Sequence, residues 1–115
     1  MSNAHQAEPQ YLGVPIYFAG HTWLVPSLSV RQMQKYLPLF EHPIVGDTVE
    51  ALNKRFETYI PVVGVAIRRN YPGVTDESLF ESLDAYTFSE AVKAIQGASG
   101  LKAVKPGEAE TQTAP

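Results

Sequence analysis

The sequence predicts a mainly α-helical protein, with a small N-terminal β-hairpin, about four helices and a disordered C-terminal tail. Three observations lead to this prediction. Two short runs of β-branched and aromatic residues flank a glycine within residues 14–25. From residue 30 to residue 95, apolar residues recur at intervals of three and four, which is the period of a helix. Serine, threonine or aspartate, whose side chains cap helices, stands at the start of each periodic run.

The chain divides into an arm, one domain and a tail. Its 115 residues suit a single domain, and a hydrophobic content of 44% is ordinary for a globular protein. Residues 1–10 are polar and are expected to form a flexible arm, ahead of a single helical domain with its hairpin at residues 11–104. Residues 105–115 have no aliphatic side chain larger than alanine. They cannot offset the entropy lost on ordering, so we expect a disordered tail.

The hairpin is expected at residues 14–18 and 22–25, with Ala19, Gly20 and His21 between the strands and the glycine in the turn. A two-stranded hairpin is marginally stable in water, so it must pack on helices or on another subunit. Trp23, the single tryptophan, lies in the second strand. We interpret it first as a core anchor, and second as part of a partner-binding surface on the outer face of the hairpin.

The first helix is expected to begin after Ser29, with Gln32 as its capping-box partner, and to end near Pro38. The residues that share one face of this helix are Val30, Met33, Leu37 and Phe40.

The second helix is the longest and begins after a cap at Asp47 or Thr48. Pro61 removes one backbone hydrogen bond, so we expect a kink there and not a break. Its core stripe consists of Val49, Leu52, Phe56, Ile60, Val63, Ile67 and Asn70.

Residues 60–67 of this helix are apolar on almost every side, because Val62 and Val65 lie off the core stripe. A helix of this kind must be buried all round, either under the hairpin or under another chain. We therefore predict that Val62 and Val65 contact a partner helix or a second copy of this chain.

Two short helices complete the domain. Thr75 is expected to cap a third helix at residues 76–83, and Thr87, with Glu90 in a capping box, a fourth at residues 88–95. Gly97 and Gly100 are two possible left-handed stops for the fourth helix. The side chains offered to the core are Leu79, Phe80, Leu83, Phe88, Ala91, Val92 and Ile95.

Composition argues against several function classes. A net charge of −3 and a pI near 5.5 give no general attraction to nucleic acid, and the one adjacent basic pair, Arg68-Arg69, is interpreted as a solvated helix end. The longest apolar run is too short to cross a membrane, and residues 1–10 lack the features of a secretory signal. We expect a cytosolic protein.

No pattern of residues indicates catalysis or a cofactor. The chain has no cysteine, and His5, His21 and His42 are scattered over the arm, the turn and a loop, so no metal site is expected. The carboxylates lie on predicted helix surfaces without the paired environments that acid–base catalysis needs. A binding or assembly protein is favoured over an enzyme subunit without a site of its own and over a small regulator.

Four segments together resemble the small tail assembly chaperones of tailed bacteriophages and prophages. They are GHTWLVPSLSVRQ at 20–32, AIRRNYPGVTDE at 66–77, SLFESLD at 78–84 and SEAVKAIQGASGLK at 89–102. The resemblance implies a non-enzymatic protein of the host bacterial cytoplasm that binds the tape measure protein and keeps it soluble during tail assembly. This chain would be the short product, and a frameshift-extended form would recruit the tail tube protein. The alternative is a minor structural or tail-completion protein retained in the virion.

Overall fold

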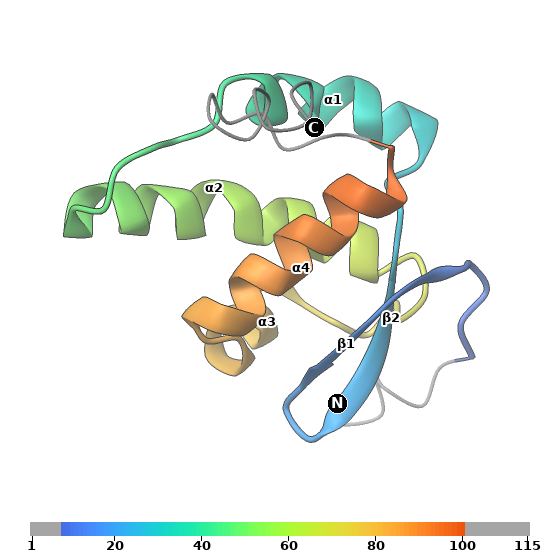
Figure 1. Ribbon diagram of the computed structural model, residues 1–115. Helices are drawn as coiled ribbons and strands as arrows, with labels where there is room; N and C mark the ends of the chain where they lie inside the picture. Colours follow the sequence, from blue (N-terminus) through green and yellow to red (C-terminus); the bar gives the residue numbers. More distant parts are fainter. Residues whose placement is uncertain (1–7, 101–115) are drawn as a thin grey trace, which may run out of the picture.

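The computed structural model describes residues 8–100 and confirms a two-stranded antiparallel hairpin followed by four helices (Figure 1). Residues 1–7 of the predicted arm, and residues 101–115 with the predicted tail, lie outside the described residues. The elements are β1 (Gly13–Phe18), β2 (His21–Pro26), α1 (Val30–Glu41), α2 (Val49–Ile67), α3 (Asp76–Ser82) and α4 (Ala85–Ala98).

A two-residue turn joins the strands of the hairpin. Ala19 and Gly20 have φ angles of 51° and 80°, and Phe18 pairs directly with His21. Positive φ at both central residues gives this two-residue turn a twist that matches the right-handed twist of the strands. His21 is therefore the first residue of β2, and its predicted place in the turn is wrong.

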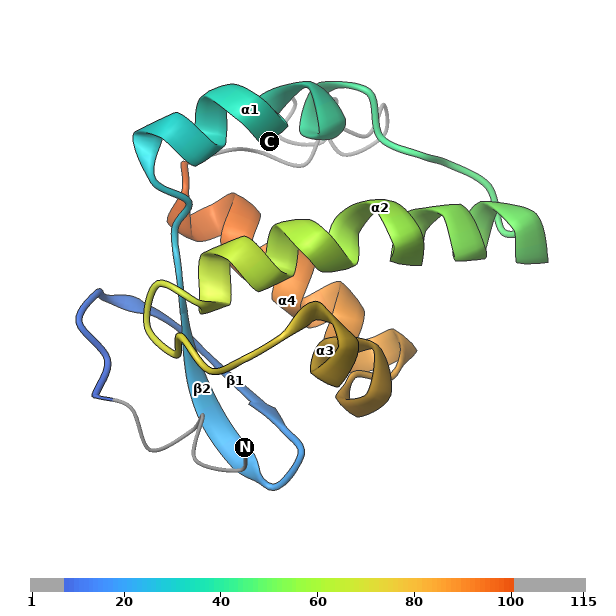
Figure 2. The same cartoon turned by 180° about the vertical axis from the view of Figure 1, so that it is seen from behind.

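One face of the hairpin packs on α4. Alternation along the strands places Ile16, Phe18, Trp23 and Val25 on the same face, and each of them is at most 8% exposed. Helix α4 contacts both strands, as Figures 1 and 2 show from opposite sides. The hairpin thus lies on a helix of its own chain, one of the two expected arrangements.

Helix α1 begins as predicted, with both bonds of the Ser29–Gln32 capping box. It ends at Glu41, and Pro38 lies within its last turn near the predicted end, because a proline removes only one hydrogen bond of the ladder. Val30 is 75% exposed, so the start of the predicted apolar face does not reach the core.

Helix α2 is capped by Thr48 and runs without interruption through Pro61. The absence of a break agrees with the prediction, and the kink stays a prediction. Burial is confined to its second half: Val49 is 74% exposed and Leu52 37%, although both were assigned to the core stripe. Helices α3 and α4 and strand β2 contact α2, and the side chains of α2 that become buried lie between Tyr59 and Ile67.

Helix α3 starts at Asp76 under the predicted Thr75 cap and ends at Ser82. Its Phe80 is 40% exposed, contrary to the predicted core position.

Helix α4 starts earlier than predicted, because Asp84 and not Thr87 is its N-cap. The Asp84 carboxylate accepts from the Thr87 backbone N–H at 2.8 Å, and the Thr87 hydroxyl accepts from the Asp84 N–H at 2.9 Å. The predicted box between Thr87 and Glu90 is wrong, since this pair already satisfies the first turn. Gly100, with φ of 77°, follows the last turn, whereas Gly97 lies within the helix.

Candidate functional site

The three residues predicted to bind a partner lie in or against the core of the described chain. Val62 is 1% exposed, and Val65 is partly buried and packs on the core. Trp23 is 7% exposed, stacks on Phe18 at a centroid distance of 5.0 Å and donates through Nε1 to the Phe18 carbonyl oxygen. Val62 was expected to be covered by the hairpin or by another chain, and elements of its own chain cover this half of α2.

The Arg68-Arg69 pair holds loops together and is not a solvated helix end. Arg68 bonds the Val74 carbonyl oxygen and forms an ion pair with Asp76 at 3.0 Å. Gly64 makes room for this pair, because a Cβ there would overlap the Asp76 carboxylate. Arg69 donates to the carbonyl oxygen of Ser27 at 2.7 Å. Both cations are thus occupied within the monomer.

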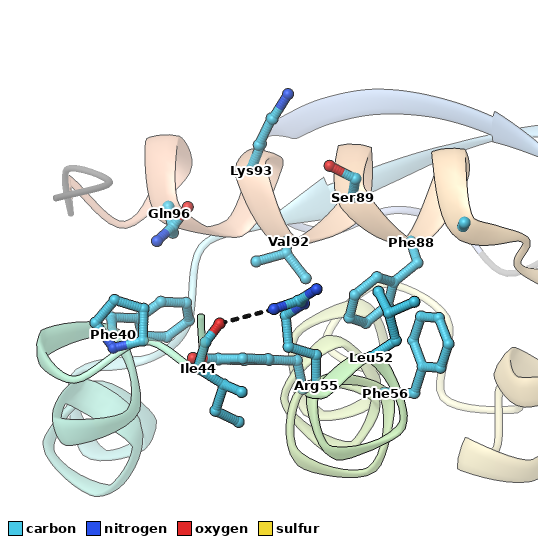
Figure 3. Close-up of a pocket in the computed structure, with 13 residues that line it drawn as sticks. Phe40, Ile44, Leu52, Arg55, Phe56, Phe88, Ser89, Val92, Lys93 and Gln96 are labelled. Carbon is cyan, nitrogen blue, oxygen red and sulfur yellow. Dashed lines mark hydrogen bonds between the residues drawn. The ribbon is translucent and has the colours of Figure 1, made fainter. Parts of the chain in front are cut away.

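One accessible apolar surface lies on the first half of α2, which extends away from the hairpin (Figures 1 and 2). Here a cavity of about 360 Å³ opens between α2, α4 and the end of α1 (Figure 3). We call it the α2–α4 groove, and its lining residues are Phe40, Pro43, Ile44, Leu52, Arg55, Phe56, Tyr59, Ala85, Phe88, Ser89, Val92, Lys93 and Gln96.

One side of α2 and one side of α4 form two walls of the groove. The lining residues of α2 and α4 are spaced by three and four along each helix, as side chains on one face must be. On α4 they extend from Ala85 to Gln96, which is about three turns or 17 Å. On α2 they extend from Leu52 to Tyr59. The groove is therefore long enough to bind a short helix, and Leu52, Phe56, Phe88 and Val92 give it an apolar centre.

A second hollow continues the apolar surface toward α3. Its volume is about 280 Å³, and it shares Phe56, Ala85 and Phe88 with the groove before reaching Phe80. The rings of Phe56 and Phe88 meet edge to face at 5.0 Å and form the ridge common to both cavities. The carboxylate of Asp84 borders this hollow but is engaged by Thr87, whose hydrogen bonds hold the Asp84 pKa below its usual value.

Tyr59 lines the groove and joins it to α1. The ring is 6% exposed, lies 5.9 Å from the Phe40 ring and donates its hydroxyl to the Leu39 carbonyl oxygen at 2.8 Å. Burial raises the pKa of Tyr59, against weaker opposing effects of the Ile44 backbone and the Arg55 charge. The phenol is neutral near pH 7 and acts as a structural hydrogen-bond donor.

Arg55 is the one charged side chain directed along the floor of the groove. Its Nη1 donates to the Ile44 carbonyl oxygen at 3.0 Å, and the guanidinium reaches toward Val92, whereas Lys93 points outward from α4 (Figure 3). Within residues 8–100, the Arg68–Asp76 contact is the single ion pair. Arg55 therefore has no carboxylate partner in this part of the chain.

The described part of the chain offers no constellation for metal chemistry and no membrane span. Between residues 8 and 100, no cluster of three or more histidine, aspartate and glutamate side chains could bind a metal ion. In the same range, no helix combines the length and the hydropathy that crossing a bilayer requires.

Sequence reasoning assigned Leu52, Phe56 and Val92 to the core and did not consider Arg55. One signal could have separated them from buried residues. At 19 residues, α2 is about 28 Å long, whereas α4 has 14 residues and α3 only 7. No single neighbouring helix matches the length of α2, so full coverage of the stripe was not to be assumed.

Comparison of the chain with protein-family models, curated proteins and solved structures found no match. The functional interpretation therefore depends on the geometry of the groove and on the sequence resemblance.

Proposed function

We propose that this protein is a non-enzymatic tail assembly chaperone of a tailed bacteriophage or prophage. It binds amphipathic helices of the tape measure protein and keeps that protein soluble in the host cytoplasm until tail tube subunits assemble around it. The observation that carries the proposal is the α2–α4 groove, in which one face of α2 and one face of α4 present Leu52, Phe56, Phe88 and Val92 between polar side chains at the edges. The chemistry of the partner follows from this shape, because a helix-in-groove complex buries an apolar stripe of the ligand between two receptor helices.

The energetics favour a binding role. Leu52 and Phe80 are 37% and 40% exposed, and they lie on a surface that is continuous through Phe56. Covering such side chains yields about 25 cal/mol for each Å² of apolar area removed from water. A groove of this kind on a monomer is a typical mark of an interaction site. Self-association and recruitment of tail tube protein through an extended form belong to the same proposal, and nucleic acid and membranes are not partners in it.

Co-expression with the tape measure protein of the same phage tests the proposal. We expect the tape measure protein to remain in the soluble fraction with the wild-type chain and to enter the pellet with Leu52→Asp. Asn53→Asp is the matched control, because Asn53 is the exposed neighbour on α2 and does not line the groove. Equal solubility with Leu52→Asp and the wild type would contradict the role of the groove.

Mass spectrometry of purified virions separates the chaperone from a minor structural or tail-completion protein. A chaperone acts before the tail is complete, so its peptides should be missing from the particle. Stoichiometric recovery with the tail proteins would favour the structural alternative.

A further inference from the structure

We infer that the α2–α4 groove selects a helix that carries a carboxylate beside its apolar stripe, and that Arg55 binds this carboxylate. This inference rests on the proposed docking of a partner helix in the groove. Its occupant is an acidic amphipathic helix, recognised jointly by the apolar walls and by one cation.

The first observation is that most hydrogen-bond donors of Arg55 have no protein partner in the described part of the chain. The guanidinium has five N–H donors and no acceptor. In the described part of the chain, it donates one hydrogen bond, to the Ile44 carbonyl oxygen. The side chain is only partly buried, so water can satisfy the remaining donors while the groove is open. Its orientation is already fixed by the bond to Ile44, which lowers the entropic cost of binding a ligand.

The surroundings of Arg55 are the second observation. Leu52, Phe88 and Val92 are apolar neighbours of Arg55 in the groove, Ser89 and Gln96 are its uncharged polar residues, and no residue that lines the groove is acidic (Figure 3). A helix that covered this floor would remove the water from Arg55. A purely apolar helix would then leave a buried charge without a partner, which is costly. A glutamate or aspartate on the incoming helix replaces the lost water with a charge-assisted, potentially bidentate hydrogen bond.

Charge balance around the groove agrees with this choice of partner. The chain as a whole has a net charge of −3, yet the charged residues lining the groove are the cations Arg55 and Lys93. Lys93 lies at the outer edge and adds long-range attraction without fixing the position of the ligand. An acidic helix is thus attracted to this surface although the protein itself is acidic.

Fluorescence anisotropy on the full chain tests the inference with two labelled amphipathic peptides of about 16 residues, a length just above that at which isolated helices become marginal. Both have the same leucine and isoleucine stripe, and they differ only in having glutamate or glutamine beside it. We expect the glutamate peptide to bind at least about tenfold more tightly, which corresponds to one hydrogen bond between charged groups. This preference should shrink as salt is added.

Substitutions at Arg55 test whether this residue causes the preference for the glutamate peptide. Arg55→Met should remove the preference for glutamate by weakening the glutamate peptide, while the glutamine peptide should bind at least as tightly as before because no charge is left to bury. Arg55→Lys should retain part of the preference. Lys54→Met is the matched control, because Lys54 is exposed on the same helix and does not line the groove. A thermal melt of each variant checks that loss of the Arg55–Ile44 bond has not disturbed the fold.

Several results would overturn the inference. Equal binding of both peptides refutes the charge preference and leaves apolar docking intact. Equal loss of both peptides in Arg55→Met makes Arg55 a structural residue. If neither peptide binds the wild type, the groove does not take an acidic helix, and co-expression with the tape measure protein decides the proposed function separately.

Two further results would assign the groove to another occupant. Dimerisation that Leu52→Asp abolishes would make a second copy of this chain the occupant. Peptide binding only after removal of residues 101–115 would make that segment the occupant.

Discussion

The side-chain amide of Asn70 donates a hydrogen bond of 3.0 Å to the carbonyl oxygen of Leu24 and thereby closes the outer edge of β2. The same nitrogen donates to the Tyr11 carbonyl oxygen, and the amide oxygen accepts from the backbone N–H groups of Gln10 and Tyr11. Asn70 is 1% exposed, and all four of its hydrogen-bonding positions are filled. One buried side chain therefore joins the N-terminal segment, the hairpin and the end of α2.

Asn70→Ala should destabilise the protein by about 2–4 kcal/mol, because it leaves several backbone groups without partners in a site with little water. Urea unfolding followed by circular dichroism measures this cost. Asn53→Ala, at an exposed position on α2, should change stability by less than about 0.5 kcal/mol. A cost for Asn70→Ala below about 1 kcal/mol would show that the Leu24 and Tyr11 groups find other partners.

The two halves of α2 should respond in opposite ways to the same substitution. Val62→Asp places a carboxylate at a position that is 1% exposed and should abolish the folded helical signal in circular dichroism. Leu52→Asp, at a position that is 37% exposed, should keep that signal and lose partner binding. A folded Val62→Asp variant would contradict the assignment of this residue to the core.

The Asp84 cap should make the free energy of unfolding fall at acidic pH. Hydrogen bonds from Thr87 lower the Asp84 pKa in the folded state, so the carboxylate stabilises the fold above its unfolded pKa of 3.8. This contribution is lost as the pH falls through the still lower folded pKa. The difference in urea midpoint between the wild type and Asp84→Asn should therefore shrink between pH 5 and strongly acidic solution. An identical difference at pH 3 and pH 7 would argue against the charged cap.

Tyr59 should impose the opposite dependence at alkaline pH. Burial raises its pKa above the ordinary value of 10.0, so the neutral phenol stabilises the fold below pH 10, and this contribution is lost as the pH rises through the folded pKa. Tyr59→Phe should remove this alkaline loss and cost about 0.5–1.5 kcal/mol at pH 7 through the missing bond to Leu39. Tyr86→Phe, at a position 72% exposed, is the control. Absorbance titration at alkaline pH measures the phenol directly.

Much of the fold was predictable because its signals are local. The Ser29–Gln32 capping box and the Thr75 cap depend on residues within one turn, and both are present. The cap of α4 was misplaced because Asp84 and Thr87 are both good N-caps, and the sequence pattern did not show that they bond to each other.

The candidate site was less predictable, because it depends on what is left uncovered. Val62 and Leu52 are similar apolar residues ten positions apart on one helix, yet the first is 1% and the second 37% exposed. The period of the stripe indicates a face of α2 but not which part of it α4 and β2 will cover. Arg69 is a similar case, since its partners Ser27 and Tyr11 are distant in the sequence.

The amino-acid order is enough to specify a hairpin, four helices and most of their caps, because turn conformations and capping bonds act over three or four residues. The proposed binding surface, in contrast, depends on the assembled domain. Burial is a property of the whole packing arrangement: the lengths and positions of α1, α3 and α4 leave Leu52, Arg55 and Phe56 on a groove, while the same α2 stripe closes into the core at Ile60, Val63 and Ile67. Contacts between residues that are far apart in the sequence, and not local propensity, determine which part of the stripe is buried and which part stays accessible.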